Sequence, residues 1–298
     1  MQPLISIVIC TYNRAEYLQK CLDSMLNQTY GNFEVIVVNG PSTDNTAGIL
    51  RNYPFQTIQQ IKKSGLSAAR NLGIKEAKGE IIAFIDDDAV ADKNWIKNLK
   101  KGYNDETIGG VGGIIYKART TDVWQAKVVV NKFGVPKCID EGEYYSLDDF
   151  YPCIVGCNMS FRKEVLLRVG CFDNYYKYYH DEIDICVRIV KAGYKLEYEP
   201  KAVVYHYCAE GPTRLDMHYH VVKNRLYFTL KNFGQELSLI EIILVDFKNF
   251  INEMTGVVVR FLRNRITLRE FIKLSMNLII GRIDGYKDGI KVRKRAQK

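Results

Sequence analysis

The sequence predicts an α/β domain with a mostly parallel, Rossmann-like central sheet flanked by helices, followed by amphipathic helices at the C-terminal end. Two observations carry this prediction. Short runs of β-branched and apolar residues alternate with helical periodicity from residue 4 to about residue 90. Such a strand–helix–strand series implies parallel strands joined by right-handed crossovers. After residue 212 the sequence becomes helical and basic, and charged residues interrupt its apolar stretches.

The first third of the chain supplies most of this series. Thr43 or Asp44, in a cluster of turn residues, is placed to cap the helix that follows. The expected strands lie at 4–10, 33–38 and 56–61, and the expected helices begin at 16 and 65. One face of the first helix collects four apolar side chains, which are Leu18, Leu22, Met25 and Leu26. We expect this face to pack against the sheet.

The apolar run at 81–85 leads directly into three carboxylates, Asp86, Asp87 and Asp88. The run predicts a buried strand, and ligands of open α/β sheets bind at the carboxyl ends of such strands. Three neighbouring like charges are costly beside a hydrophobic strand unless a cation neutralises them. Oxygen ligands suit Mg²⁺ or Mn²⁺, and such ions commonly carry substrate phosphates. The alternative is a solvated acidic turn.

The second half of the domain has a less regular pattern. Residues 117–150 are rich in Lys, Tyr and acids, and we expect an irregular, mobile loop over a site there. The cluster at 180–188 places acids in the first turn of a helix, where they suit the helix dipole. Further strands are expected at 109–116, 153–162, 196–199 and 202–206, and further helices at 95–101 and 163–169.

The chain has a net charge of +8, which fits phosphate-bearing ligands or an anionic membrane surface. No nucleic-acid-binding motif occurs, so no nucleic-acid partner is expected. The eight cysteines form no CxxC pair, which favours reduced core thiols in the cytosol over a zinc site. Neither a signal peptide nor a long uncharged apolar run occurs. We therefore expect a cytoplasmic protein, peripheral on the inner face of the membrane.

Six motifs in order resemble the family 2 glycosyltransferases, over roughly residues 4–210. They are Ser6 to Arg14, Val37 to Asp44, Ala68 to Asn71, Phe84 to Asp88, Gly156 to Met159 and Asp181 to Asp184. The resemblance implies a GT-A fold. It also implies a nucleotide-diphosphate sugar donor, a divalent metal (Mn²⁺ or Mg²⁺) and an inverting mechanism.

The resemblance places the nucleotide at the end of the first strand, against Thr11, Tyr12 and Arg14. Asn39 stands where many relatives carry an aspartate for the base or ribose. An amide both donates and accepts hydrogen bonds, so this departure leaves the identity of the base open. Arg70 would reach the nucleotide or diphosphate, with a surface salt bridge as the alternative. For Tyr12 the alternative is packing.

In the acidic triplet the resemblance assigns Asp86 to the ribose or base side and Asp88 to the metal, with Asp87 assisting. His206 resembles a histidine that completes the metal shell in some relatives. The alternative for His206 is a structural side chain after a strand.

The catalytic base falls by register on Glu182, with Asp181 as second choice, because this chain reads Asp-Glu where relatives often read Glu-Asp. Asp184 would cap or orient the helix. Gly156 and Asn158 resemble the acceptor-side strand. The aromatic residues Trp124 and Tyr151 are candidates for sugar stacking or for the core.

Together these features predict an inverting glycosyltransferase of polysaccharide, cell-envelope or glycolipid biosynthesis, acting on a glycan or lipid-linked acceptor. Residues 1–212 would form the GT-A domain, with a nucleotide-sugar and metal half at 1–115 and an acceptor half at 116–212. Residues 213–298 would form a basic, helical, membrane-associating region. Two alternatives stay open: a degenerate nucleotide-sugar or glycan-binding protein, and a sugar nucleotidyltransferase. The second would usually carry a Gly-rich phosphate loop, which residues 11–14 lack.

Overall fold

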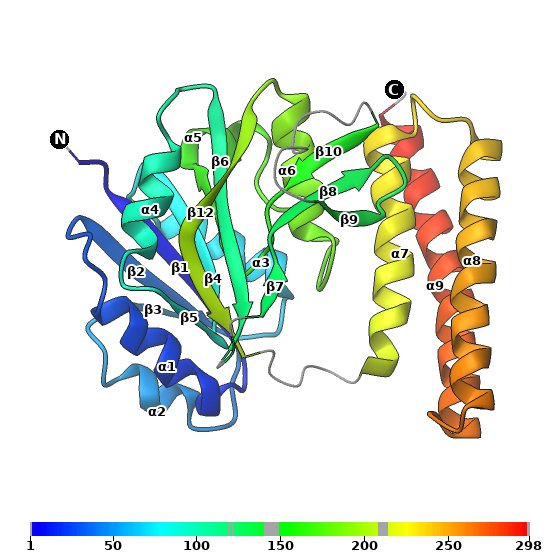
Figure 1. Cartoon of the computed structure of the whole chain (residues 1–298), viewed down its shortest axis with the longest axis horizontal. Helices are drawn as coiled ribbons and strands as arrows, with labels where there is room; N and C mark the ends of the chain where they lie inside the picture. Colours follow the sequence, from blue (N-terminus) through cyan, green and yellow to red (C-terminus); the bar gives the residue numbers. More distant parts are fainter. Residues whose placement is uncertain (1, 119, 121, 140–148, 208–213, 297–298) are drawn as a thin grey trace. The chain divides into compact units, whose positions relative to one another are not determined.

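A computed structural model describes residues 2–118, 120, 122–139, 149–207 and 214–296 (Figure 1). The chain divides into two compact units. The first comprises residues 1–129 and 137–209, and the second comprises residues 130–136 and 210–298. The short segment 130–136 belongs to the second unit although it lies within the sequence of the first, which no feature of the sequence had indicated.

The first unit begins with the parallel strands that the sequence predicts. Their order in the sheet is β3-β2-β1-β4, and every neighbouring pair among them is parallel. The strands are β1 (Ile5–Thr11), β2 (Phe33–Asn39), β3 (Gln56–Gln59) and β4 (Ile81–Asp86). Because β1 and β4 are the most apolar, they lie in the middle of the sheet and are almost fully buried.

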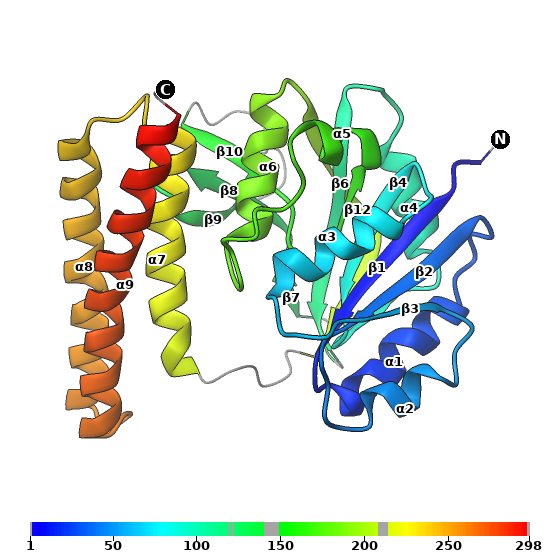
Figure 2. The same ribbon diagram turned by 180° about the vertical axis from the view of Figure 1, so that it is seen from behind.

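Helices cover both faces of this sheet, as the views from opposite sides show (Figures 1 and 2). Ile5, Ile7 and Ile9 of β1 join a core with α1 and α4, whereas Val8 meets Gly73 of α3. The helices are α1 (Ala15–Leu26), α2 (Thr46–Leu50), α3 (Leu66–Glu76) and α4 (Trp95–Gly102).

One side chain of α1 departs from the expected pattern. Leu18, Leu22 and Met25 are buried as expected, but Leu26 is 55% exposed, so its expected burial is wrong. At about 100° per residue Leu26 lies about 80° around the helix from Leu18. Cys21, on the other side of Leu18, is buried in its place.

The sheet continues with mixed strand directions, in the order β4-β11-β6-β12-β5. Strand β11 is antiparallel to both of its neighbours, whereas β12 is parallel to β6. These strands are β5 (Ala89–Ala91), β6 (Ile108–Lys117), β11 (Met159–Arg162) and β12 (Lys195–His206). The glycines of β6 permit close packing: a Cβ at Gly113 would lie 2.0 Å from the carbonyl oxygen of Ala202.

The expectation of an irregular segment at 117–150 is wrong for much of its described part. Strand β7 pairs with β6, and β10, β8 and β9 form a separate three-stranded sheet. The strands are β7 (Val123–Gln125), β8 (Lys127–Asn131), β9 (Pro136–Ile139) and β10 (Phe150–Cys153). The turn between β8 and β9 is local, because the Asn131 side chain accepts from two backbone amides and Gly134 has φ +70°. Residues 119, 121 and 140–148 lie outside the described residues.

Two helices complete the first unit: α5 (Lys163–Arg168) and α6 (Asp181–Lys191). Helix α6 begins after His180, whose backbone is left-handed with φ +69°. Its first turn carries all three acids of the second cluster. This position favours the ionised carboxylates because the backbone amides of a helix start point at them.

The second unit contains three long helices, α7 (Arg214–Phe233), α8 (Leu239–Leu262) and α9 (Leu268–Arg295). Capping boxes begin α8 at Ser238 and α9 at Thr267. The core of the unit lies between the helices and includes Leu226, Leu274 and Leu278. In the described part of the chain, no helix is long and apolar enough to cross a membrane.

The contact at Gly113 gives the first prediction. We expect Gly113→Ala to lower the unfolding free energy by at least about 2 kcal/mol, because β6 and β12 would have to separate. Gly31→Ala is the matched control, since a Cβ there meets nothing within 4 Å and its effect should stay within about 0.5 kcal/mol. Thermal and urea unfolding of both variants measure this. Equal stability of the two would contradict the packing described for β6.

Candidate active site

The predicted nucleotide and metal residues gather where β1, β2 and β4 end. Register places Thr11 beside Asn39 and Cys10 beside Asp86. The carboxyl ends of parallel strands meet at one edge of a sheet, so three stretches far apart in the sequence share this edge.

The acidic triplet is largely withdrawn from water. Asp87 and Asp88 are buried, whereas the side chain of Asp86 is about one third exposed. Burial raises the pKa of Asp87 to about 7, against the opposing effect of the Thr11 hydroxyl. Burial also raises the pKa of Asp86, although the charge of Arg70 opposes it. A bound cation would offset the cost of burying these neighbouring carboxylates, as the sequence argument predicts.

His206 ends β12 beside these acids. Its Nε2 lies 3.0 Å from Asp88 Oδ1 and 3.8 Å from Asp86 Oδ2. Burial lowers the pKa of His206, but the hydrogen bond and the charge of Asp88 raise it by a larger amount, so the net shift is upward. The imidazole therefore faces the acidic triplet.

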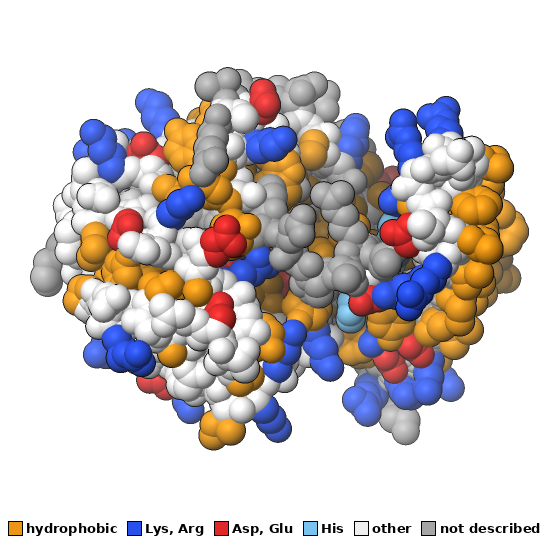
Figure 3. All heavy atoms as spheres, turned by 90° about the horizontal axis from the view of Figure 1, so that it is seen from below, with side chains coloured by type: hydrophobic (Ala, Val, Ile, Leu, Met, Phe, Trp, Pro, Cys, Tyr) orange, Lys and Arg blue, Asp and Glu red, His pale blue; other side chains and the backbone are white. Residues whose placement is uncertain are grey.

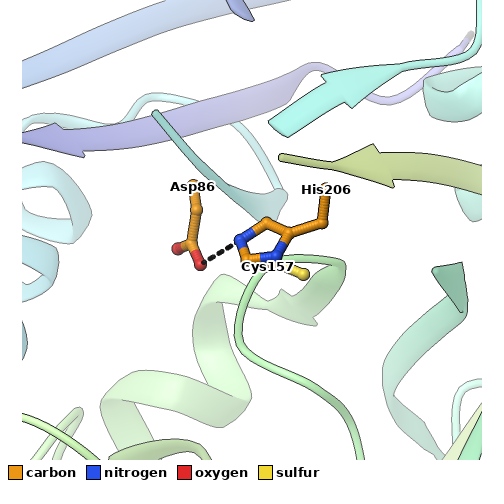
Figure 4. A group of neighbouring side chains, drawn as sticks. All are labelled: Asp86, Cys157 and His206. Atoms are coloured by element: carbon orange, nitrogen blue, oxygen red, sulfur yellow. Dashed lines mark ion pairs between the residues drawn. The ribbon is translucent and has the colours of Figure 1, made fainter. Parts of the chain in front are cut away.

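A third donor, which sequence reasoning missed, is the thiol of Cys157. One potential ligand atom each from Asp86, Cys157 and His206 lie within 4.8 Å of one another. Figure 4 shows the three side chains converging from β4, from the segment between β10 and β11, and from the end of β12. The only available signal was the position of Cys157 inside the Gly-Cys-Asn-Met motif, which says nothing about distance to an acid.

This donor set fits a divalent cation. One donor atom each of Asp86, Cys157 and His206 lies within 4.8 Å of the other two, so the three could together hold one ion. Carboxylate and imidazole together suit Mn²⁺ better than Mg²⁺, which prefers oxygen alone, and a thiol adds a softer donor. We name Asp86, Asp88, Cys157 and His206 the metal corner.

Trp124 lies directly against the metal corner. Its ring stacks on that of His206, with ring centroids 4.6 Å apart and planes 9° apart. Pairing of β7 with β6 brings it there. Trp124 is 44% exposed, so one face of its ring holds the imidazole in place while part of the ring faces solvent. A sugar could use only the outer face. The other stacking candidate, Tyr151, is half-buried in β10.

Arg70 joins the two acidic clusters. It is buried, forms an ion pair with Asp181, lies 3.5 Å from Asp86 Oδ1 and donates to the carbonyl of Gly156 at 3.3 Å. The alternative of a surface salt bridge is therefore wrong. Burial lowers the pKa of Arg70, but Asp181 and Asp86 raise it more. The guanidinium is charged, and both Asp86 and Asp181 lie against it.

The two acids at the start of α6 have different surroundings. Asp181 is 1% exposed and forms an ion pair with Arg70, whereas Glu182 is partly exposed. Burial and the charge of Asp181 raise the pKa of Glu182. Asp184 accepts from Arg188 Nε at 2.8 Å and from the Tyr176 hydroxyl at 3.3 Å, which orients α6. Of these three acids, Glu182 is the least buried.

At the end of β1, two residues present groups suited to a ligand. Thr11 is buried, and its hydroxyl makes no hydrogen bond of normal geometry among the described residues. Tyr12 is 37% exposed, its ring lies against Gly40, and Lys63 Nζ stands 4.4 Å from the ring centroid. The backbone amide of Arg14 donates to Thr46. An aromatic face beside a cation suits a nucleotide base and its phosphates.

Two other predicted residues are engaged inside the protein. Asn39 is buried, donates to the Gln59 side chain and accepts from Ser42, so it holds the loop after β2. Asn158 is completely buried, and this geometry does not support direct contact with an acceptor. Its amide donates to two backbone carbonyls and its oxygen accepts from the indole of Trp95.

The sequence matches a known protein family. The family model named Glycosyl transferase family 2 matches residues 6–170, which is more than half of the chain. The chain belongs to this family of glycosyltransferases. The resemblance inferred from the six motifs is thereby confirmed, and membership decides against a nucleotidyltransferase.

Curated relatives give the family's range. GlyG of Streptococcus pneumoniae is 35% identical over 41% of this chain and 42% of its own length. EpsH of Bacillus subtilis, a putative glycosyltransferase by name, is 38% identical over 35% and 32%. This glycosyltransferase therefore spans less than half the length of these two relatives. A glucuronosyltransferase of Methanococcus voltae is 25% identical over 93% of this chain and 92% of its own length.

Solved structures confirm the GT-A fold. Residues 1–349 of TarS from S. aureus, in complex with UDP-GlcNAc, superpose with a TM-score of 0.61 at 17% identity, covering 98% of this chain and 91% of that one. The mannosyltransferase PcManGT from Pyrobaculum calidifontis, in complex with GDP-Man and Mn²⁺, gives 0.57 at 18% identity over 97% and 88%. At these identities the likeness concerns the fold alone.

Because Trp124 stacks on His206, tryptophan fluorescence can report metal binding at the metal corner. The chain has two tryptophans, and Trp95 is fully buried. We expect saturating Mn²⁺, a paramagnetic ion, to quench part of the tryptophan fluorescence, and we expect EDTA to restore it. Trp124→Phe should remove the quenchable part, and His206→Ala should weaken Mn²⁺ binding about 10- to 100-fold. Undiminished quenching in Trp124→Phe would contradict this placement.

Proposed function

We propose that this glycosyltransferase transfers a sugar, with inversion, from a nucleotide-diphosphate donor to a hydroxyl of a glycan or lipid-linked acceptor. One observation carries the proposal. Arg70 binds Asp181 and approaches Asp86, so the metal corner and the start of α6 both lie next to one buried guanidinium. This arrangement leaves Glu182, the least buried of the three acids of α6, next to a site suited to a diphosphate.

The metal corner would hold the divalent ion through Asp88 and His206, with Asp86 and Cys157 close enough to contribute. When bound, the ion stabilises negative charge on the departing diphosphate. Arg70 carries a second fixed positive charge at the same place. A diphosphate stabilised in this way is a good leaving group, so the site needs no separate acid to protonate it.

Glu182 is the group proposed to take the proton of the acceptor hydroxyl as its oxygen attacks the anomeric carbon. Its raised pKa makes it a stronger base than an ordinary carboxylate. Asp181, the second choice, is neutralised by Arg70 and is better suited to positioning. A single base on the face opposite the leaving group gives inversion.

The donor would lie against the ends of β1 and β4. Tyr12 and Lys63 suit the base and phosphates, and Thr11 offers its buried hydroxyl. Two structural neighbours support a nucleotide-sugar donor, since their names record GDP-Man with Mn²⁺ and UDP-GlcNAc. Asn39 is buried and donates to Gln59, so the proposed role of its side chain is to hold the loop after β2 beside the donor.

The acceptor proposal includes a lipid-linked saccharide. Its support is the name of the Methanococcus voltae relative, which describes transfer to a dolichyl phosphate-linked sugar and which matches nearly the whole chain. Glycan, cell-envelope and glycolipid biosynthesis all fit such an acceptor. Transfer assays with purified glycans and glycolipids as acceptors test this proposal.

The role of Glu182 can be separated from that of Asp181. We expect Glu182→Gln to lower kcat by about 10²- to 10⁴-fold with little change in melting temperature. Asp181→Asn should also lower stability, by about 3–5 kcal/mol, because Arg70 would stay buried without its partner. Glu164→Gln, an exposed acid in α5, is the control. Near-normal turnover of Glu182→Gln would rule out this base.

The same base predicts the pH profile. Only the ionised carboxylate accepts a proton, so kcat/KM should rise with pH through the raised pKa of Glu182. The acid limb should therefore lie well above the ordinary carboxyl value of about 4.3. Proton NMR of the product's anomeric centre tests inversion independently.

Donor class and metal dependence can be read from one thermal-shift screen of UDP, GDP, dTDP and CDP, each with Mn²⁺ or with EDTA. We expect one nucleotide to raise the melting temperature with Mn²⁺ and to lose that effect in EDTA, because a ligand of the folded state stabilises it. Asp88→Asn should remove the metal-dependent shift. Binding of a nucleotide sugar with neither transfer nor donor hydrolysis would favour a degenerate binding protein.

A further inference from the structure

Helices α8 and α9 each carry a row of exposed apolar side chains, which we call the apolar stripes. Their members are 37–73% exposed and recur at helical spacing. The stripe of α8 is Ile240, Leu244, Phe247, Ile251, Val258 and Leu262, and that of α9 is Leu268, Ile272, Met276, Ile279 and Ile283. Figure 3 shows hydrophobic side chains gathered along one side of this helical unit.

The apolar stripes are additional to the side of each helix that packs within the unit. Ile242 and Val257 of α8, and Leu274 and Leu278 of α9, are buried in the core and belong to other positions around the helix. A helix that only packs against its own unit needs one apolar side. Large exposed apolar surfaces mark interaction with a partner or a membrane.

The acids of α8 and α9 all have partners within the helical unit. Glu241 and Glu270 take part in the capping boxes, and Asp284 accepts from the hydroxyl of Tyr219. The other three are paired with cations: Asp246 and Glu253 with Arg225 and Arg282, and Asp288 with Lys223 and Lys291. Half of the acidic charge of the two helices is therefore matched by cations inside the unit.

Basic side chains, by contrast, are exposed at both ends of the hairpin. Arg260, Arg263, Arg265 and Arg269 surround the α8–α9 turn, and Lys287, Lys291, Lys294 and Arg295 follow toward the end of α9. Residues 214–296 hold 16 Lys and Arg against eight Asp and Glu, a net charge of +8, which equals that of the whole chain. The apolar stripes are thus bordered by an excess of exposed positive charge.

We propose that the apolar stripes of α8 and α9 form a docking surface for an anionic membrane, with both helices lying in the plane of the lipid headgroups. Apolar residues flanked by Lys and Arg are the pattern of interfacial helices. Each basic residue near an anionic surface adds to the attraction. A second copy of the chain is a poorer occupant, because it would bring another +8 against the same surface.

The test is co-sedimentation of the full chain with vesicles of phosphatidylcholine alone or mixed with phosphatidylglycerol, at low and high salt. We expect binding to the anionic vesicles, weakened by salt. Phe247→Ser should reduce that binding about tenfold, because an apolar group that enters the lipid is lost. Asn252→Ser, an exposed change on the same helix outside the apolar stripe, should leave it unchanged.

A second variant tests the electrostatic part. Arg263→Gln should weaken binding to anionic vesicles and reduce its salt dependence, without affecting weak binding to neutral ones. Circular dichroism and the metal-dependent nucleotide shift should stay unchanged in all three variants, so a failure here is distinct from a failure of the proposed catalysis. No anionic binding at low salt, equal binding by Phe247→Ser, or dimerisation that Phe247→Ser abolishes would each overturn the proposal.

Discussion

The buried ion pair between Arg70 and Asp181 is the interaction on which the site depends. Breaking such a pair by removing one partner costs about 3–5 kcal/mol, because the remaining charge stays buried. Arg70 comes from α3 and Asp181 from α6, and the same guanidinium approaches Asp86 at the end of β4. One guanidinium therefore links Asp86 of the acidic triplet to Asp181, the residue beside the proposed base.

Most of the first unit could be predicted because its strands are short, apolar and followed by polar turns. In β1 and β4 a continuous apolar run indicates a strand buried on both faces. The acids after β4 mark the edge of the sheet where a ligand would bind. The residues 123–139 were harder. Their strands pair with segments remote in sequence, and local cues such as Asn131 and Gly134 indicate a turn without naming its partner strand.

Site residues could be predicted where the residue type alone indicated the chemistry. They could not be predicted where the role depends on which residues lie close together in the folded chain. Carboxylates after a buried strand suit a cation, so the sequence predicted Asp88 as a metal ligand, but it assigned Asp86 to the ribose or base instead. Cys157 and Trp124 were not predicted at the metal corner, because only the fold brings Cys157 to Asp86 and His206, and only the pairing of β7 with β6 brings Trp124 against His206. Conversely, Asn158 belongs to a family motif, yet its hydrogen bonds join β6, β12 and the indole of Trp95.

Net charge was the most ambiguous sequence feature, since +8 fits either a phosphate-bearing ligand or an anionic surface. Its distribution separates the two. The first unit, residues 1–129 and 137–209, holds 24 Lys and Arg against 25 Asp and Glu, so it has almost no net charge. The proposed diphosphate would meet a few placed cations there, such as Arg70. The diffuse positive charge belongs to the helices with the apolar stripes, where a broad field attracts an extended anionic surface.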